Sequence, residues 1–309
     1  MGYIDKPGKF NKNTWLIDPA YKNSEGNRAS HGHAVYLIHT EEGTNCLINS
    51  GPQSGAQDVY KKLKRLNAWP LHKLILTHSH WDHTQGVIFY REKVKEENLA
   101  PIQIFASEKA IPYLKDQSYN VCFSDMPFYS EFLNIEGVTP LKEKEKIILD
   151  NTITLEIIET PGHMLDHISL YDEKNKTAFV GDAPGMHWFT DFYVCNSNSI
   201  YWQENDYLES IEKIKTLDLD FLCIAHFGVF TGDDILRFLD NSVSMYYKWM
   251  KLLNQNSNLL EDPKSLINLM WETIYKDFNK PIYRQTLEKS LESSLLNAIN
   301  YYKGLKKIG

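Results

Sequence analysis

The chain has 309 residues, of which 42% are hydrophobic and 24% are charged, enough for one large globular domain or a domain with a subdomain. Its net charge of −7 reflects 33 basic and 40 acidic residues, and the basic residues are scattered among the acids. This distribution argues against a nucleic-acid partner, because proteins that bind phosphate backbones present a broad basic surface.

Cysteine usage and the N-terminal residues predict a cytoplasmic protein. The four cysteines, Cys46, Cys122, Cys195 and Cys223, lie far apart and form no CxxC pair. Such usage is typical of reduced thiols and not of a disulfide framework or a zinc knuckle. The sequence shows neither the apolar core of a signal peptide nor an apolar run long enough for a membrane span, so we expect no membrane partner.

From residue 34 onward, short apolar strands alternate with amphipathic helical windows. The segments 34–40 and 45–51 flank a Glu-Glu-Gly-Thr turn and predict a hairpin. Further apolar runs predict strands over 72–77, 101–106, 146–151, 153–160, 167–173, 176–183 and 219–226. Apolar residues at helical spacing predict helices over 54–67, 108–116 and 205–218. The pattern indicates an α/β fold with much antiparallel pairing.

The pattern changes after Gly232. Residues 233–254, 263–278 and 283–307 have apolar stripes at helical spacing and no strand signal. We therefore predict a mixed α/β domain over residues 1–231 and a C-terminal α-helical subdomain over residues 232–309.

The segment LTHSHWDHTQG places His78, His80, Asp82 and His83 within six residues, directly after a predicted strand. A chance H-x-H-x-D-H string is rare, so this motif is a strong signal. In an extended segment residues two apart point the same way, so His78 and His80 can bind one ion, while the following turn directs Asp82 and His83 toward a second. Each histidine alone would be assigned a structural role; together they favour a metal site.

Three further residues that can bind metals stand at predicted strand ends: His163, Asp182 and His226. With these in place, the sequence resembles the metallo-β-lactamase superfamily, whose pattern is H-x-H-x-D-H followed by a separate His, Asp and His. The resemblance covers about residues 30 to 230 and fills all seven positions. It implies a four-layer αβ/βα sandwich with metals in the cleft between the sheet edges.

The resemblance also implies a role for each of the seven residues. The first metal would be held by three histidines, His78, His80 and His163. The second would be held by Asp82, His83 and His226, and Asp182 would bridge the two. We expect two divalent metal ions. Zinc is the preferred identity of both, with iron or manganese as alternatives. Hydroxide formed from a shared water would attack an ester-like carbonyl, and Asp82 would also pass a proton to the leaving group.

Among the branches of this superfamily, the helical tail and THSHWDH most resemble glyoxalase II, which hydrolyses glutathione thioesters. Its glutathione-binding basic residues are not identified in this sequence. Acyl-homoserine lactonases have a tyrosine three residues after the bridging aspartate, where this chain has Gly185, and Tyr193 is a candidate replacement. True β-lactamases lack an aspartate equivalent to Asp82, which argues against antibiotic hydrolysis. We expect a thioester- or lactone-class hydrolase whose small-molecule substrate has an apolar part.

Other functions are kept as alternatives. Diiron proteins of the superfamily that carry out redox chemistry or sense oxygen replace His80 by Glu, whereas neutral His80 suits zinc. A phosphodiesterase or nuclease on the same fold is opposed by the weak basic character. A non-catalytic metal-stabilised module is the least favoured. The oligomeric state is open, and a homodimer is one option.

The pair His163 and His167 has the spacing of one helix face. Pro161 and Gly162 interrupt a helix, and strand-like residues resume at once, so we expect the two histidines to separate. His167 is then predicted to support the site by a hydrogen bond near Asp166 or the site floor.

Several other features have open roles. Asn49 stands where many superfamily members have an aspartate that orients a metal ligand. His31 and His33 precede the first predicted core strand, and a place at the active site is one option for either. The aromatic segments 118–133 and 183–193 would either roof the cleft or anchor loops in the core.

Overall fold

The computed structural model describes residues 2–19, 21–22, 28–29, 32–123, 132–188, 192–195, 197, 199, 201–279 and 281–308. His31 and parts of both aromatic segments, 124–131 and 189–191, lie outside these residues.

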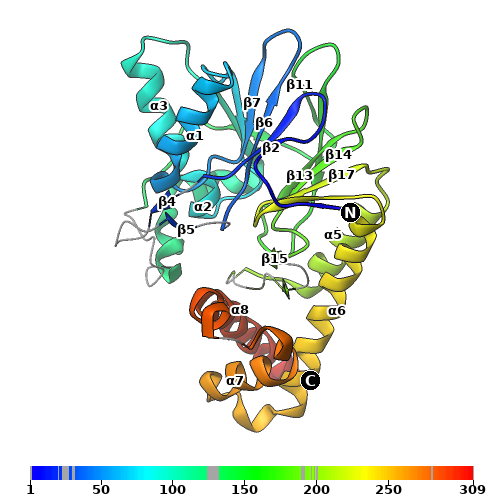
Figure 1. Ribbon diagram of the computed structural model, residues 1–309. Helices are drawn as coiled ribbons and strands as arrows, with labels where there is room; N and C mark the ends of the chain where they lie inside the picture. The colour runs from blue at the N-terminus through cyan, green and yellow to red at the C-terminus, as the bar shows by residue number, and fades with distance from the viewer. Residues whose placement is uncertain are drawn as a thin grey trace.

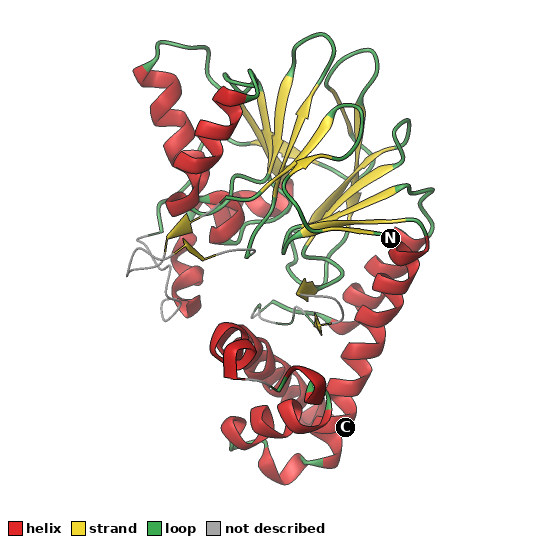
Figure 2. Cartoon of the chain, viewed as in Figure 1, coloured by secondary structure: helices red, strands yellow, loops and turns green. Residues whose placement is uncertain are grey.

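Two seven-stranded sheets form the centre of the molecule (Figures 1 and 2). The first contains, in spatial order, β1 (Tyr3–Ile4), β18 (Gly228–Thr231), β17 (Phe221–Ile224), β14 (Thr177–Gly181), β13 (Ile168–Asp172), β12 (Thr154–Glu159) and β11 (Lys146–Ile148). The second contains β10 (Thr139–Leu141), β9 (Gln103–Ser107), β8 (Lys73–Ile75), β7 (Asn45–Ile48), β6 (Val35–His39), β3 (Thr14–Ile17) and β2 (Gly8–Lys9). Two ribbons are separate, β4 (Tyr21–Lys22) with β5 (Arg28–Ala29) and β15 (Met186–Trp188) with β16 (Phe192–Val194).

Helices cover the outer face of each sheet, which gives four layers (Figure 2). Strand β6 shows how alternation builds them. Val35 and Leu37 face the helical side, where they join a buried cluster with α1 (Gln53–Arg65) and α3 (Gly86–Glu96). Tyr36 and Ile38 face the other sheet and join the core between the sheets. On the far side, α5 (Glu204–Lys215) packs on the first sheet through its buried face. The predicted αβ/βα sandwich is confirmed.

Short helices complete the sandwich. They are α2 (Trp81–Thr84), α4 (Ile111–Lys115) and the 3₁₀ turns η1 (Glu108–Ala110) and η2 (Gln117–Phe123). Ser107 caps η1 as an N-cap residue should, because its side-chain oxygen accepts a hydrogen bond from the Lys109 amide at 3.2 Å.

The tail consists of α6 (Asp233–Gln255), α7 (Pro263–Thr273) and α8 (Pro281–Ile308), with 3₁₀ turns η3 (Ser257–Leu259) and η4 (Lys276–Phe278). These helices lie below the sandwich in Figure 1, and α6 leads from one to the other. The Tyr275 hydroxyl accepts a hydrogen bond from the Trp249 indole (3.1 Å) and donates one to the Tyr193 carbonyl (2.8 Å). The helical character predicted for the tail is confirmed. None of the helices in the described parts of the chain combines the length and apolar character of a membrane span.

Candidate metal centre

The H-x-H-x-D-H motif lies between β8 and the one-turn helix α2. Residues 76–80 have no helix or strand, and α2 begins at Trp81. His78 and His80 therefore lie in the non-helical stretch before α2, while Asp82 and His83 belong to its helical turn. Trp81 is buried and Thr84 donates a hydrogen bond to the His80 carbonyl at 3.0 Å, so both have structural roles.

The other three residues also stand at element ends. His163 lies in the non-helical connection between β12 and β13, so His163 and His167 share no helix face. Asp182 follows β14, whose pairing with β17 is irregular between Phe179 and Gly181. His226 occupies the turn between β17 and β18. The parallel pairs β7·β8 and β14·β17 bring these ends to one edge of the sandwich.

One group of donor atoms comprises His78, His80, His163 and Asp182, all buried. The Nδ1 atom of His80 lies 3.2 Å from His78 Nε2 and 2.9 Å from His163 Nε2. Asp182 Oδ2 is 3.5 Å from His163 Nε2 and 4.0 Å from His78 Nε2. Three imidazole nitrogens and one carboxylate oxygen thus face a common point. The distances between these atoms are those of neighbouring ligands on one divalent ion.

A second group comprises His83, Asp182 and His226, with Asp82 beside them. His226 Nε2 lies 3.1 Å from Asp182 Oδ2 and 3.7 Å from Asp82 Oδ2. The Nε2 atom of His83 lies 3.2 Å from Asp82 Oδ2 and 3.5 Å from Asp182 Oδ2, yet it is buried without an aligned hydrogen bond. A nitrogen in this position fits a metal ligand. Asp182 belongs to both groups, and its Oδ2 atom lies near histidines of each.

The charges of the two groups differ. Burial lowers the pKa of His78 and of His80 well below the usual value, so both are neutral and ready to bind a cation. Burial alone would also lower the pKa of His83, but the Asp82 and Asp182 carboxylates raise it to about 10. Although burial opposes ionisation, nearby imidazoles hold the pKa of both carboxyl groups well below the usual range. The second group is therefore an ion-paired cluster in which a metal can replace protons.

Asn49 holds His78 through an intervening residue. His78 Nδ1 is 3.1 Å from the Thr77 hydroxyl, which donates to Asn49 Oδ1, also at 3.1 Å. Asn49 Oδ1 accepts a second hydrogen bond, from the Thr77 amide at 2.9 Å. In this chain His78 Nδ1 is the donor, which leaves Nε2 to face the first group. An amide thus takes the acceptor position expected of an aspartate.

His167 supports Asp182 from behind. The Asp182 amide donates to His167 Nε2 at 3.1 Å, and His167 Nδ1 lies 2.9 Å from the Thr160 hydroxyl. Its ring also stacks on His78, with centroids 5.0 Å apart. Both ring nitrogens are used, which agrees with a supporting role, although the partners are Thr160 and Asp182 and not Asp166.

His33 lies at the site although its sequence position gave little signal. It is buried, and its Nε2 atom lies 2.7 Å from Asp82 Oδ2. Together with Asp82 and His226 it forms a third group of atoms able to hold a metal. Only its place just before the first core strand could have indicated this role, because nearly 50 residues separate it from the motif.

The two aromatic segments have different surroundings. Tyr119 lies beside the first group, with its ring stacked on His80 (centroids 6.3 Å apart) and its hydroxyl donating to Ser79 Oγ at 2.8 Å. In the second segment, Phe192 stacks on Tyr275 of the helical tail, with centroids 4.4 Å apart. Tyr193 packs its ring against His187 and belongs to the buried core, and its role as a replacement for the lactonase tyrosine stays a prediction.

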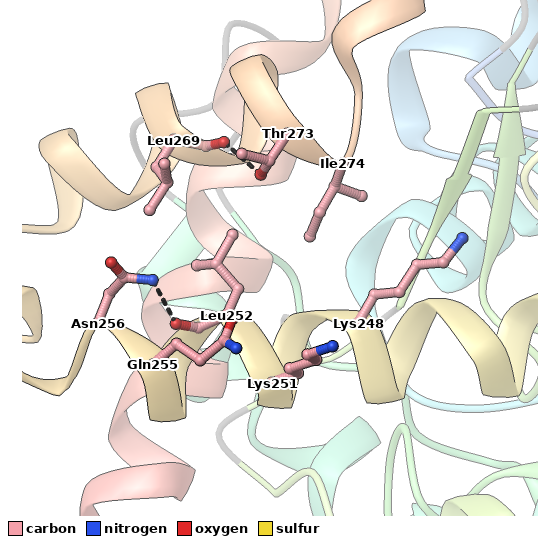
Figure 3. A pocket seen from close by; sticks show the side chains of 8 residues that line it. All are labelled: Lys248, Lys251, Leu252, Gln255, Asn256, Leu269, Thr273 and Ile274. Atoms are coloured by element: carbon pink, nitrogen blue, oxygen red, sulfur yellow. Dashed lines mark hydrogen bonds between the residues drawn. The ribbon is translucent and has the colours of Figure 1, made fainter.

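A separate hollow lies in the helical tail, between α6 and α7 (Figure 3). Its lining comprises Lys248, Lys251, Leu252, Gln255, Asn256, Leu269, Thr273 and Ile274. None of these residues is a His, Cys, Asp or Glu, so the hollow offers no metal ligand of the kind seen at the sheet edge.

The comparison with protein families decides the assignment. The model of the metallo-beta-lactamase superfamily matches residues 30–226, well over half of the chain and all seven residues. The chain belongs to the metallo-β-lactamase superfamily. The fold and the family expected from the motif are both confirmed.

Proteins named hydroxyacylglutathione hydrolase are among its relatives in the superfamily. The one from Bartonella tribocorum is 28% identical over 147 residues, which are 48% of this chain and 46% of that protein, so the chain spans about half of that relative. The one from Francisella philomiragia is 24% identical over 284 residues, 88% of this chain and 92% of that protein. An archaeal metallo-β-lactamase superfamily protein from Sulfolobus tokodaii shares the fold, with a TM-score of 0.60 and 18% identity over 77% of this chain and 87% of that chain.

Proposed function

We propose that this protein is a hydrolase that uses two divalent metal ions to cleave a thioester or lactone, and that both ions are zinc. The observation that carries the proposal is the convergence of seven donor residues, with Asp182 Oδ2 facing histidines of both groups. Similarity to proteins named hydroxyacylglutathione hydrolase supports the thioester class, because their named substrate is a thioester. Three described cysteines are free and buried, which supports a reducing, cytoplasmic location.

The donor residues divide the work. His78, His80 and His163 would hold the first ion, and Asp82, His83 and His226 the second, with Asp182 between them. Once bound, the ions would supply Lewis acidity and an activated water. Burial of most donor atoms keeps bulk water from competing for them.

Asp82 is suited to move a proton. Its side chain is 13% exposed, compared with 2% or less for His78, His83 and Asp182, so it is more accessible from solvent than they are. Neighbouring imidazoles outweigh the effect of burial and hold the pKa of Asp82 well below its usual range, so the carboxylate is ionised at neutral pH. It would accept a proton from the nucleophile and return it to the leaving thiolate or alkoxide.

Three tyrosines support a substrate with an apolar part. Tyr113, Tyr119 and Tyr201 form a cluster, the tyrosine wall, with ring centroids 5.1 to 6.2 Å apart. Each is partly exposed, and Tyr119 stacks on His80. A carbonyl held between the metal groups would extend its substituent along this wall.

The proposal is tested with purified protein that has been stripped by a chelator and reloaded with zinc. Thioesters, lactones and phosphodiesters are assayed in parallel. We expect thioester or lactone hydrolysis that is lost on stripping, restored by zinc and reduced by at least 100-fold in Asp182→Asn. Full activity in the stripped protein, or a clear preference for phosphodiesters, would contradict the proposal.

Substitution of the tyrosine wall tests the substrate class. We expect Tyr119→Ala to raise KM for aryl thioesters about 10-fold, while KM for acetyl thioesters stays within about twofold, because only the larger acyl group reaches the ring. Tyr247→Ala, at an exposed tyrosine of α6, is the matched control and should change neither value. Equal effects on both thioesters would count against an apolar subsite at the wall.

A further inference from the structure

The segment Gly32–His33–Ala34 contacts two residues of the second donor group, His226 and Asp82, and also Ala225, the neighbour of His226. The Ala34 amide donates to the Ala225 carbonyl at 2.7 Å and so fixes the segment beside the His226 turn. His226 Nδ1 donates to the Gly32 carbonyl at 2.6 Å, which turns His226 Nε2 toward Asp182. His33 lies between these contacts and reaches Asp82. A segment far from the motif in sequence therefore holds two of the four residues of this group.

Asp82 has few restraints from its own element. It belongs to α2, a helix of four residues, and its side chain is the most exposed among the residues of the second group. His33 is 7% exposed, and its ring is packed against His226 (centroids 5.0 Å apart) and Trp81 (6.4 Å). A buried ring in a fixed orientation can thus restrain a carboxylate that its helix leaves free.

His33 contacts the oxygen of Asp82 that faces the other residues of the second group. His33 Nε2 lies 2.7 Å from Asp82 Oδ2, the same oxygen that is 3.2 Å from His83 Nε2 and 3.7 Å from His226 Nε2. A carboxylate oxygen has two lone pairs, so it can accept an N–H from His33 on one side and bind a cation on the other. This hydrogen bond directs Oδ2 toward His83 and His226.

We propose that His33 is a positioning residue for the second metal subsite, where its Nε2–H holds Asp82 Oδ2 in the orientation that binds the ion. The inference rests on the metal-binding part of the proposed function. Loss of such a supporting hydrogen bond commonly weakens metal binding by about 10- to 100-fold. The loss should fall on the second ion, because the contacts of His33 with Asp82, His83 and His226 all lie in that group.

Two substitutions separate the hydrogen bond from the shape of the ring. His33→Phe keeps a ring against Trp81 but cannot donate, whereas His33→Gln loses the ring but keeps an N–H donor at similar reach. His39→Phe is the matched control, since His39 is a partly buried histidine of β6 whose ring meets Trp15, with centroids 6.2 Å apart. Stripped proteins are titrated with zinc by calorimetry and with cobalt by visible absorption.

We expect the wild type and His39→Phe to bind two ions. In His33→Phe the first ion should bind as in the wild type, the second should bind 10- to 100-fold more weakly, and the cobalt band of the second ion should change. His33→Gln should restore the second ion to within about threefold of the wild type. Retention of the first ion also shows that each variant is folded.

Each remaining outcome overturns the inference. Two ions bound by His33→Phe as tightly as by the wild type would exclude a positioning role while leaving the proposed function intact. Equal loss in His33→Phe and His33→Gln would mean that the imidazole itself binds the ion. A wild-type protein that binds no ion would overturn the proposed function and this inference together.

Discussion

At the residue scale, the position of Asp182 depends on the glycine before it. Gly181 has φ of +51°, a conformation that side chains rarely adopt. A Cβ there would lie 2.5 Å from His167 Nε2 and 2.9 Å from the Thr77 hydroxyl, two groups that support the donors. Residues that hold Asp182 and His78 thus leave no room for any side chain at position 181.

Gly181→Ala should therefore damage both metal groups. We expect it to weaken the binding of both ions, because Asp182 faces both donor groups. It should also lower the free energy of unfolding by roughly 1–3 kcal/mol. Calorimetric zinc titration and chemical denaturation measure the two effects. Gly304→Ala is the control: it lies in α8, where a Cβ would meet nothing within 4 Å, and should be neutral or slightly stabilising. Two ions bound with unchanged affinity by Gly181→Ala would refute this account.

The pKa values of the histidines predict different pH dependences for the two ions. Although burial lowers the pKa of His83, the Asp82 and Asp182 carboxylates raise it to about 10, so at pH 6–8 His83 carries a proton that the second ion must displace. Lower pH favours the protonated form. For each displaced proton, the affinity for the second ion should fall about tenfold per unit decrease in pH. His78 and His80 are neutral over this range, so the first ion displaces no proton from them when it binds.

Zinc titrations at pH 6, 7 and 8, in two buffers of different ionisation enthalpy, measure both affinities and the protons released. The second ion should bind more weakly as the pH falls, with release of about one proton or more, while the first should change little. A steeper pH dependence for the first ion than for the second would contradict the assignment.

At the element scale, the turn that carries His226 is strained and is held by tyrosines. Phe227 has φ of +134°, which is unusual for a residue other than glycine. The Tyr3 hydroxyl donates to the Phe227 carbonyl at 2.6 Å. The single hydroxyl hydrogen of Tyr36 is shared between the carbonyls of Ile224 (2.6 Å) and Gly228 (2.8 Å). Strands of both sheets therefore fix this turn.

Tyr36→Phe should loosen the turn. It leaves two buried carbonyls without their donor, so we expect a loss of about 1–3 kcal/mol in the free energy of unfolding and weaker binding of the second ion. Tyr171→Phe removes a hydrogen bond at the surface, from Tyr171 to the Asp218 carbonyl, and should cost less than about 1 kcal/mol without affecting metal. Chemical denaturation and zinc titration compare the two variants; equal costs would argue against a special role for Tyr36.

What the sequence predicts at this scale depends on element length. The longer apolar runs of β6 and β12 are predicted because a continuous or alternating apolar pattern is visible in them, whereas the four-residue strands β3 and β18 are not predicted. Strands of two residues, such as β1 and β2, carry no period and were missed, although β1 extends the first sheet. His33 could not be assigned because its contact with Asp82 depends on strand order: His33 precedes β6 and Asp82 follows β8, two strands of one sheet that β7 separates.

At the scale of the whole molecule, the helical tail and the sandwich share a core. Phe230 of β18 stacks on Phe238 of α6, with centroids 4.2 Å apart and planes 14° apart. Buried residues of β14, β17 and α5 belong to the same cluster as those of α6, α7 and α8. The boundary expected at 231/232 thus crosses a continuous apolar contact, and whether residues 1–231 form an independent domain remains a prediction.

Truncation tests this boundary. A chain of residues 1–231 would expose the sheet face that α6 covers near Phe230, and we expect it to aggregate or to lose cooperative unfolding. A chain of residues 1–255 keeps α6 and its stack on Phe230, so it should fold but unfold at a lower temperature, because Tyr275 no longer covers Phe192. Thermal unfolding and zinc stoichiometry compare both with the full chain. A chain of residues 1–231 that unfolds cooperatively and binds two zinc ions would show that the sandwich is independent and that the tail serves another purpose than completing its core.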